Sequence, residues 1–482
     1  MYNSKPILMK FITKLHYILL LIVVFTTSLT SCSDEFLEII PKGRLIAEKV
    51  VDYDKMFYNL NLVNMRSTNA QVPMGAELVA FEPYFTATDL RTQRLYKWEA
   101  RVYEDEQNAA ELENTMENLY IYNKIINEVM SATEGSEQEK ASLQAEALAG
   151  RAWVYFMVTN YYGMPYNEET SGTDLGFPIV LEADLVADNF TRATVEENYE
   201  LMVSDLTKAI PNLPMQVNSR FRFSRAAGKA LLGKIYTFMG KYEEAKPMLE
   251  QALGEMKNIG IEAGLLDYNN GYRSQRVDTD PESLYGKQII NNWANTSNEL
   301  VVKPEVMALY QETDLRLQAL YVKTARGNNA PYPVEGVYRK QKGSGQTFYG
   351  VRVPELYLLL AEVRARLNDL NAATTLLEDF RAHRMPIAEA DVPAATASNR
   401  EALLKYIFDE RLREFAALGF HWFDMRRLTV DQDIPTPASN YSHILYDAEG
   451  NVIEEYKLTQ DRLVLRFPKS VMDQNPNLIN ND

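Results

Sequence analysis

The chain has 482 residues, of which 46% are hydrophobic and 24% are charged, a composition typical of a folded soluble protein. This length accommodates either one large domain with insertions or two domains. The formal net charge is -16. A surface this acidic repels phosphate backbones, which argues against nucleic acid as a binding partner.

The amino terminus has the pattern of a secretory signal. Lys5, Lys10 and Lys14 precede an apolar run of eight residues, Ile18 to Phe25, which is far shorter than the roughly 20 residues that span a bilayer. A basic start followed by a short apolar stretch is typical of a signal peptide. Leu29-Thr30-Ser31-Cys32 then resembles a bacterial lipobox. We therefore predict that residues 1–31 are removed and that Cys32 is lipidated.

Cys32 is the only cysteine in the chain, so no intramolecular disulfide can form. Its thiol stands where a lipid anchor requires one, and several acyl chains together hold a protein stably on a membrane. Ser33-Asp34-Glu35 follow and resemble the surface-export signal of Bacteroidetes lipoproteins. We expect a lipid-anchored protein exposed on the cell outer membrane. An anchor that faces the periplasm is the alternative.

Apolar residues recur with helical spacing from about residue 105. The three stripes are Leu112, Met116, Leu119, Ile126 and Met130; Ala145, Leu148, Ala152, Tyr155 and Tyr162; and Val195, Tyr199, Met202, Leu206 and Ile210. Ser136 with Glu139, and Thr194 with Glu197, form capping-box patterns where the second and third helices start. Pro211 closes the third.

Two later segments, residues 231–253 and 359–380, are similar to each other. Four pairs align at one offset of 128 residues: Leu232, Gly233, Ala245 and Leu249 with Leu360, Ala361, Ala373 and Leu377. The spacing matches the tetratricopeptide pattern, in which small residues lie where two helices cross closely. We predict helix pairs of this kind. Two unrelated amphipathic hairpins are the alternative.

The segment between these repeats, residues 258 to 350, has a different texture. Gly, Asn, Pro and Tyr are frequent, and long helical periods are scarce apart from a short helix near Pro304 to Leu317. We interpret it as an irregular insertion on a helical scaffold, where binding residues tend to lie. The tail from residue 431 is also loop-like, with a hairpin predicted around Asp447-Ala448-Glu449-Gly450.

Several segments together resemble the SusD/RagB family of Bacteroidetes outer-membrane nutrient-binding lipoproteins. They occur in the family's order: SCSDEFLEIIPKGRL, AEALAGRAWVYFMVTNYYGMPY, RATVEENYELMVSDLTKAIPNLP, FSRAAGKALLGKIYTFMGKYEEA, PESLYGKQI, ERLREFAALGFHWFDMRRL and FPKSVMDQNPNLINND. One stretch departs from the pattern. Residues 418–421 are Leu-Gly-Phe-His, where the family commonly has an acidic residue, Gly, a hydrophilic residue and Arg before Trp-Phe-Asp.

The resemblance implies a mainly α fold with tetratricopeptide-like helix pairs and an irregular, loop-rich part that carries short strands. It implies a single SusD-like domain over residues 32–482. The helical scaffold would cover about residues 100–257 and 351–428, and the ligand-binding half about 33–99, 258–350 and 429–482. Such proteins bind nutrient glycans without chemistry, and they deliver them to a SusC-like, TonB-dependent transporter that they cover as a lid.

One cluster of charged residues could be interpreted as a catalytic site. Glu410, Arg411, Arg413, Glu414, Asp424, Arg426 and Arg427 lie within eighteen residues. Paired carboxylates serve acid/base chemistry in glycoside hydrolases, but helical spacing also explains these residues as a structural Arg–carboxylate network. We favour the network, and we expect no catalytic residue and no cofactor.

Other motifs for chemistry are incomplete. The histidines His383, His421 and His443 lack metal-ligand spacing, so we expect no metal site. The stretch from Gly228 to Lys234 approaches a phosphate loop, but Ile235 stands where Ser or Thr would hold Mg²⁺. A surface-anchored helical glycoside hydrolase and a tetratricopeptide-type scaffolding protein remain as alternative functions.

Two regions combine aromatic rings with planar polar groups, the mixture that binds the flat faces and hydroxyl rims of sugars. The first choice is the insertion, with Tyr268, Tyr272 and Trp293 beside Asn269, Asn270 and Arg273. The second is residues 81–98, with Tyr84, Asp89 and Arg91. Trp98 is expected in the core, at the start of the first scaffold helix.

Overall fold

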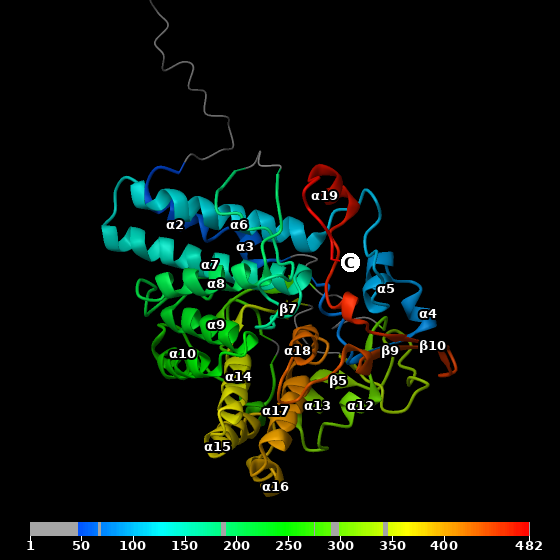
Figure 1. Cartoon of the computed structure of the whole chain (residues 1–482). Helices are drawn as coiled ribbons and strands as arrows, with labels where there is room; N and C mark the ends of the chain where they lie inside the picture. The colour runs from blue at the N-terminus through cyan, green and yellow to red at the C-terminus, as the bar shows by residue number, and fades with distance from the viewer. Residues whose placement is uncertain are drawn as a thin grey trace, which may run out of the picture. The chain divides into compact units, whose positions relative to one another are not determined.

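Long helices and short strands make up the chain, which confirms the predicted mainly α class (Figure 1). The computed structural model describes residues 47–65, 69–184, 189–273, 275–290, 298–340 and 346–481. The chain divides into two units, Met1–Glu48 and Lys49–Asp482, and the helices and strands described all belong to the second. The predicted signal peptide, Cys32 and Trp293 lie outside the described residues.

The long helices form a stack in which each one contacts the next along the chain. In Figure 1 the stack runs from α6 at the top to α15 near the bottom. Its members are α6 (Ala110–Glu128), α7 (Glu137–Tyr162), α8 (Val195–Ala209), α9 (Arg225–Phe238), α10 (Tyr242–Glu255), α14 (Val353–Arg366) and α15 (Leu370–Ala382). Helix α10 packs against both α9 and α14, so the insertion between residues 255 and 353 does not interrupt the stack.

Both predicted capping boxes are present. The Glu139 backbone N–H donates to Ser136 Oγ over 3.2 Å, and the Ser136 N–H donates back to Glu139 Oε2 over 2.7 Å. Thr194 and Glu197 exchange the same pair of bonds at 3.1 and 2.7 Å. Each box satisfies two N–H groups that have no partner within the helix, which fixes where α7 and α8 begin.

The predicted close crossings are also confirmed. A Cβ atom on Gly233 would lie 2.6 Å from Leu249 Cγ and Cδ2, so α9 and α10 approach too closely for any side chain there. Ala245, Ala361 and Ala373 have no exposed surface. The small residues of the two repeats therefore lie where the prediction placed them.

The predicted buried face of the first long helix is correct only in part. Leu112 and Leu119 are buried as predicted, whereas Ile126 is partly buried and Met130, in the 3-10 turn after α6, is 39% exposed. Tyr122 and Ile125 are buried in its place. The buried face also carries polar residues with partners: Asn123 Oδ1, for example, accepts a hydrogen bond from Arg151 Nη1 at 3.0 Å. A search for apolar stripes overlooks such residues, which explains the error.

The rest of the chain forms short strands, loops and small helices. A four-stranded sheet has the order β10-β9-β1-β4, and three two-stranded ladders pair β2 with β8, β3 with β7 and β5 with β6. The strands are β1 (Leu78–Phe81), β2 (Ser283–Tyr285), β3 (Gln288–Ile290), β4 (Val301–Val302), β5 (Tyr321–Val322), β6 (Arg339–Lys340), β7 (Gln346–Phe348), β8 (Val351–Arg352), β9 (Ser442–Tyr446) and β10 (Val452–Lys457). Strand β1 pairs in parallel with β9, with Ala80 opposite Leu445.

The remaining helices are shorter than the stack helices, apart from α17. They are α2 (Val50–Met56), α3 (Leu60–Val63), α4 (Glu82–Phe85), α5 (Leu90–Tyr96), α12 (Pro304–Met307), α13 (Leu315–Leu320), α16 (Ala394–Ala397), α17 (Arg400–Phe415), α18 (Phe420–Leu428) and α19 (Lys469–Gln474). The single helix predicted near Pro304 to Leu317 is thus two helices. The first ends at Met307, and Asp314 caps the start of the second by accepting from the Arg316 N–H at 3.0 Å.

Two turns near the carboxyl end can be compared with the sequence predictions. The predicted hairpin joins β9 to β10, and Asp447 Oδ1 accepts from the Asn451 N–H at 2.7 Å. The late charged segment is two helices, α17 and α18, separated by a turn in which Gly419 has φ +84°. A Cβ there would also lie 2.4 Å from Gln71 Cγ, so this position requires glycine.

Candidate functional site

A groove of about 250 Å³ opens in the insertion, and its lining includes Tyr268 and Tyr272, two of the three aromatic residues predicted to bind the ligand there. We call it the Tyr268 groove. Its lining residues are Leu266, Asp267, Tyr268, Asn270, Gly271, Tyr272, Arg273 and Gln275. The rings of Tyr268 and Tyr272 stack with centroids 5.0 Å apart at 26°. Among the residues that the structure describes, none of 81–98 lines this groove.

The turn that carries the groove is fastened to the end of α15. The Tyr268 N–H donates to the His383 carbonyl at 2.9 Å, and Asn269 Nδ2 donates to the Ala382 carbonyl at 2.8 Å. Within the turn, Asp267 Oδ1 accepts from the Asn269 N–H at 2.9 Å. The insertion therefore holds its aromatic pair at a fixed place beside the helical stack.

The two tyrosines differ in how much surface they present. Tyr268 is 9% exposed, whereas Tyr272 is half-buried. The guanidinium carbon of Arg384 lies 4.9 Å from the centre of the Tyr268 ring, within the range of a cation–π contact. Burial raises the pKa of Tyr272 to about 12, so its phenol is a neutral hydrogen-bond donor. Tyr272 offers the accessible ring, and Tyr268 with Arg384 supports it.

Arg384 is held by two buried carboxylates. It donates to Glu414 Oε1 and Oε2 at 2.8 and 2.9 Å, and to Glu282 Oε1 at 2.7 Å. Burial by itself would raise the pKa of Glu414, but the adjacent cations, Arg384 and Arg316, lower it to about 2. Sequence reasoning missed Arg384, because its partner Glu282 lies 102 residues away.

The charged cluster of the late helices is an Arg–carboxylate network. Glu410 accepts from Arg316, Arg381 and Arg413 at 2.6 to 2.7 Å and has no exposed surface. Asp424 accepts from Arg411 at 2.8 Å. Despite burial, these arginines hold the pKa of Glu410 well below its usual value. A buried, ionised and fully paired carboxylate is poorly suited to deliver a proton to a substrate.

The second region is packed rather than open. Asp89 caps α5 by accepting from the Thr92 N–H at 3.0 Å, and Arg91 donates to Asn69 Oδ1 at 2.9 Å. Arg91 also forms an ion pair with buried Glu111. Tyr84 is partly buried against a cluster of apolar side chains that includes Phe81. The structure thus gives each of these residues a partner within the fold.

Trp98 is buried, as predicted, but it does not begin a scaffold helix, since α6 begins at Ala110. Its backbone has φ +52°, and its ring stacks on His443 with centroids 4.0 Å apart. The indole N–H donates to the Met74 carbonyl at 3.1 Å. These contacts make Trp98 a core residue that joins β9 to the chain before α5.

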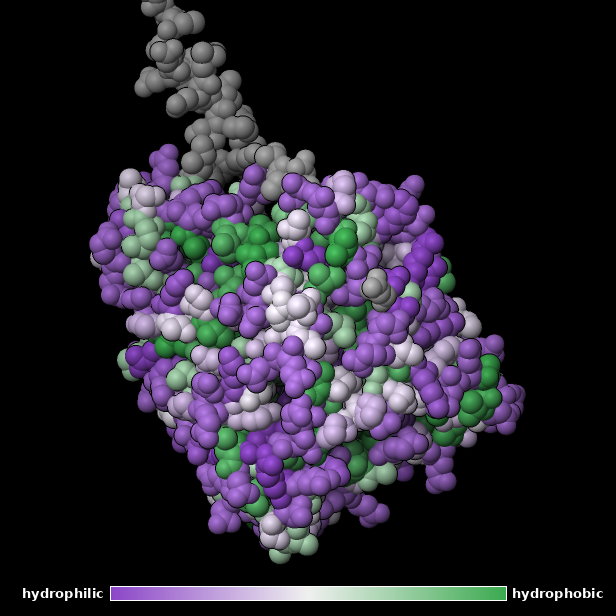
Figure 2. Space-filling model, viewed as in Figure 1, coloured by the Kyte–Doolittle hydropathy of each residue, from purple (hydrophilic) through white to green (hydrophobic). Residues whose placement is uncertain are grey.

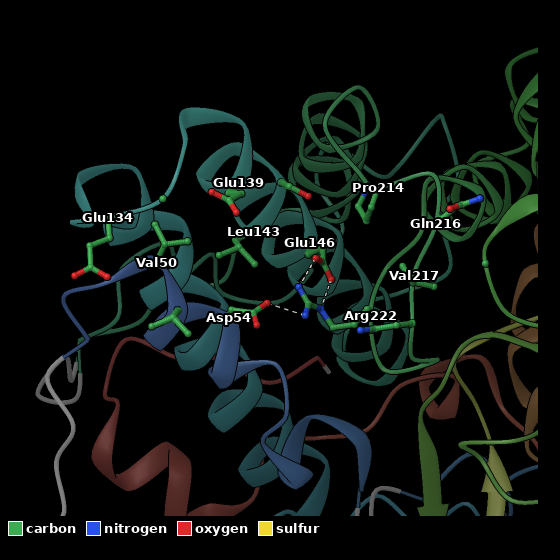
Figure 3. Close-up of a pocket in the computed structure, with 15 residues that line it drawn as sticks. Val50, Asp54, Glu134, Glu139, Leu143, Glu146, Pro214, Gln216, Val217 and Arg222 are labelled. Carbon is green, nitrogen blue, oxygen red and sulfur yellow. Dashed lines mark hydrogen bonds and ion pairs between the residues drawn. The ribbon is translucent and has the colours of Figure 1, made fainter.

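A larger cleft of about 780 Å³ lies on the helical side, between α2, the start of α7 and the loop from Pro214 to Arg222 (Figure 3). At its centre Arg222 bridges Glu146, at 2.6 Å, and Asp54, at 2.8 Å. Among the described residues that line it, none is aromatic. The cleft therefore lacks a ring on which a sugar could stack.

Three further features complete the description. Hydrophilic residues cover most of the face shown in Figure 2, with hydrophobic residues in smaller patches between them. Within the described ranges, no helix is both long enough and apolar enough to cross a membrane. The part of the chain that the structure covers also has no group of three or more His, Cys, Asp or Glu placed to hold a metal ion.

Comparisons with known proteins agree with this architecture. A family model described as "Starch-binding associating with outer membrane" matches residues 35–237, and one described as "SusD family" matches residues 326–482. No curated protein is similar enough to this chain to count as a match.

Solved structures of the same fold cover nearly the whole chain. A SusD superfamily protein from Bacteroides thetaiotaomicron VPI-5482 has a TM-score of 0.72 at 21% identity, over 90% of this chain and 100% of that one. A putative sugar binding protein from Bacteroides vulgatus ATCC 8482 has a TM-score of 0.69 at 21% identity, over 91% and 99%. These structures show the fold, and the two family models, which match residues 35–237 and 326–482, show that the chain belongs to the SusD/RagB-like family.

Proposed function

We propose that this protein is a non-catalytic lipoprotein of the outer membrane that binds nutrient glycans and delivers them to a SusC-like, TonB-dependent transporter. Family membership supports the class of function, and the description of one matching model names starch binding and the outer membrane. The glycan, the anchor at Cys32 and the transporter partner are parts of the proposal.

The stacked pair Tyr268–Tyr272 is the observation that carries the proposal. A sugar ring is apolar on its face and hydroxylated at its rim, so it stacks on an aromatic ring while amides and guanidinium groups bind its hydroxyls. The groove supplies both kinds of group, since Asn270, Arg273 and Gln275 line it beside Tyr272. A volume of about 250 Å³ suits one or two sugar units of a longer chain.

The two alternatives have less support. A glycoside hydrolase needs a proton donor and a second carboxylate beside the bound sugar, but the carboxylates behind the groove, Glu282 and Glu414, are buried and bound by Arg384. A protein that only scaffolds other proteins would not require an aromatic pair at an open groove.

Binding can be tested with a glycan array followed by calorimetry of the best ligand. We expect a Kd in the micromolar range or weaker, because an open groove excludes water poorly. Tyr272→Ala should weaken binding by roughly tenfold, which is about 1.4 kcal/mol, and leave the melting temperature within about 2 °C of the parent. Tyr58→Ala is a matched control, since Tyr58 is 48% exposed and lies outside the groove.

Two outcomes would contradict the proposal. If Tyr272→Ala and Tyr268→Ala both bind the glycan as tightly as the parent does, the glycan site lies outside the Tyr268 groove. If the purified protein shortens the glycan and Glu410→Gln or Glu414→Gln abolishes this activity, the hydrolase alternative is correct.

A further inference from the structure

We propose that the Tyr268 groove selects anionic glycans, with Arg273 binding the carboxylate or sulfate of a charged sugar unit. The inference rests on the proposed glycan-binding function and adds the class of sugar that the groove takes. It starts from the state of the two charged side chains that line the groove, Asp267 and Arg273.

The carboxylate of Asp267 is already occupied. Its Oδ1 accepts from the Asn269 N–H at 2.9 Å and from Asn269 Nδ2 at 2.8 Å, and its Oδ2 accepts from Asn270 Nδ2 at 2.7 Å. These three donors are neutral, so Asp267 keeps its negative charge, but they occupy most of the acceptor positions of its two oxygens. Asp267 therefore has little capacity left to accept hydrogen bonds from a ligand.

Arg273 is in the opposite state. Its side chain is exposed at the groove, and within the part of the chain that the structure describes its guanidinium forms no hydrogen bond or ion pair. Other arginines of the insertion are paired. Arg276 binds both oxygens of Asp278 at 2.9 and 3.0 Å, and Arg352 lies 3.1 Å from Glu282.

The wall behind the tyrosines does not cancel this charge. Asp280, Glu282 and Glu414 are each bound by Arg352 or Arg384 at 2.7 to 3.3 Å, so acidic and basic groups alternate there. Among the described residues, Arg273 is thus the charged side chain of the lining whose hydrogen-bonding groups are free to meet a ligand, whereas those of Asp267 are largely occupied. A guanidinium binds a carboxylate through two parallel hydrogen bonds, and such charge-assisted bonds are roughly twice as strong as neutral ones.

The geometry matches one kind of sugar. A uronic acid carries its carboxylate on the ring, so a ring stacked on Tyr272 brings the anion within reach of a side chain one residue away. A sulfate ester offers the same charge with a different arrangement of oxygens. A neutral sugar would gain only ordinary hydrogen bonds from Arg273. We therefore expect the protein, despite its net charge of -16, to prefer acidic sugars.

Calorimetry with matched sugars tests this inference. The probes are oligomers of galacturonate and of glucuronate, their carboxyl-reduced neutral forms, and a sulfated oligosaccharide. At least one acidic probe should bind about tenfold more tightly than its neutral or desulfated counterpart. Arg273→Gln should remove that preference and leave the affinity for the neutral form unchanged, and Arg273→Lys should restore part of it. Arg276→Gln, a change in an arginine already paired with Asp278, should have no effect.

Each other outcome is informative. Neutral oligosaccharides that bind at least as tightly as acidic ones, in a manner that depends on Tyr272, would overturn the preference and leave the glycan groove in place. If Arg273→Gln changes the affinity for acidic and for neutral sugars equally, Arg273 does not discriminate between sugars by their charge. If no sugar of either kind binds, the proposed function itself fails. A preference for the sulfated probe alone would assign the anion as sulfate.

Discussion

Arg384 and Tyr268 are in direct contact, with the guanidinium carbon 4.9 Å from the centre of the ring. Arg384 follows α15, whereas Tyr268 belongs to the insertion, so this contact joins the helical stack to the floor of the groove. The stability of the fold and the shape of the proposed binding site therefore depend on the same side chain.

Replacing Arg384 should destabilise the whole protein. Arg384→Met leaves the buried carboxylates of Glu282 and Glu414 with fewer partners, and breaking a buried pair costs about 3–5 kcal/mol. Urea denaturation at pH 7 measures the loss. Arg276→Met is the matched control, because its pair with Asp278 is on the surface and should be worth less than about 1 kcal/mol. Equal losses in the two variants would show that the buried network contributes no more than a surface pair.

The crossing of α9 and α10 predicts a strong coupling between two substitutions. Gly233→Ala should destabilise the parent by about 1–3 kcal/mol, because the new methyl group would overlap Leu249. In a Leu249→Ala background the same change should stabilise by up to about 1 kcal/mol, because alanine favours helix more than glycine does. A double-mutant cycle by urea denaturation measures the difference.

A second glycine provides the control for that cycle. Gly254 lies in α10, and a Cβ there would have no atom within 4 Å. Gly254→Ala should stabilise the parent by about 0.5–1 kcal/mol through helix propensity alone. If Gly233→Ala behaves like Gly254→Ala in the parent, the helices are not in the close contact described.

Because Lys287 is buried, we expect the free energy of unfolding to rise with pH. It lies among the rings of Tyr122, Trp153 and Tyr285 at 4.8 to 5.5 Å, and burial lowers its pKa from 10.5 to about 7. Between pH 7 and 10 the unfolded state therefore binds more protons than the folded state, and the free energy of unfolding increases with pH. We expect this group to contribute about 3 kcal/mol over that range, allowing for cation–π attraction in the folded state.

Comparison with a variant isolates this contribution. The free energy of unfolding of the parent minus that of Lys287→Met should rise by this amount from pH 7 to pH 10, as measured by urea denaturation. For Lys405→Met, which removes an exposed partner of Glu401, the same difference should stay constant. A constant difference for Lys287→Met as well would mean that Lys287 keeps its proton in the folded state.

Cys32 should determine where the protein resides. In cells fed a fatty-acid analogue, the parent should take up label and sediment with membranes, whereas Cys32→Ala should do neither, because several acyl chains are needed for stable anchoring. Ser33→Ala, a change at the next residue, is the control and should behave like the parent. Label on Cys32→Ala in the membrane fraction would refute the lipobox interpretation.

The features that the sequence predicted correctly are local. The capping boxes need only Ser136 and Glu139, or Thr194 and Glu197, three residues apart. The close crossing at Gly233 follows from a repeat whose two copies share one pattern of small residues. In each case the partners lie in one short segment, so residue type and spacing were sufficient.

The features that could not be predicted depend on distant partners. Arg91 has the chemistry of a ligand-binding residue, but the fold brings Glu111 and Asn69 to it, and this reveals a structural role. Nothing in the sequence around Arg384 indicated its role, because its partner Glu282 comes into contact with it only in the folded chain. The composition of the insertion pointed to Tyr268 and Tyr272, yet only their burial distinguishes the accessible ring from its support.

The parallel pairing of β1 with β9 has a consequence for how the chain folds during synthesis. Nε2 of His443, in β9, lies within hydrogen-bond distance, 2.8 Å, of the Gly75 carbonyl oxygen, which is 368 residues earlier in the chain. The stacked helices can form from neighbouring segments as they emerge, but the central sheet must wait for nearly the last residues of the chain. Contacts of such long sequence separation form slowly. Ribosome-bound fragments that end before residue 440 should therefore have a protease-resistant helical stack and an unprotected edge at β1.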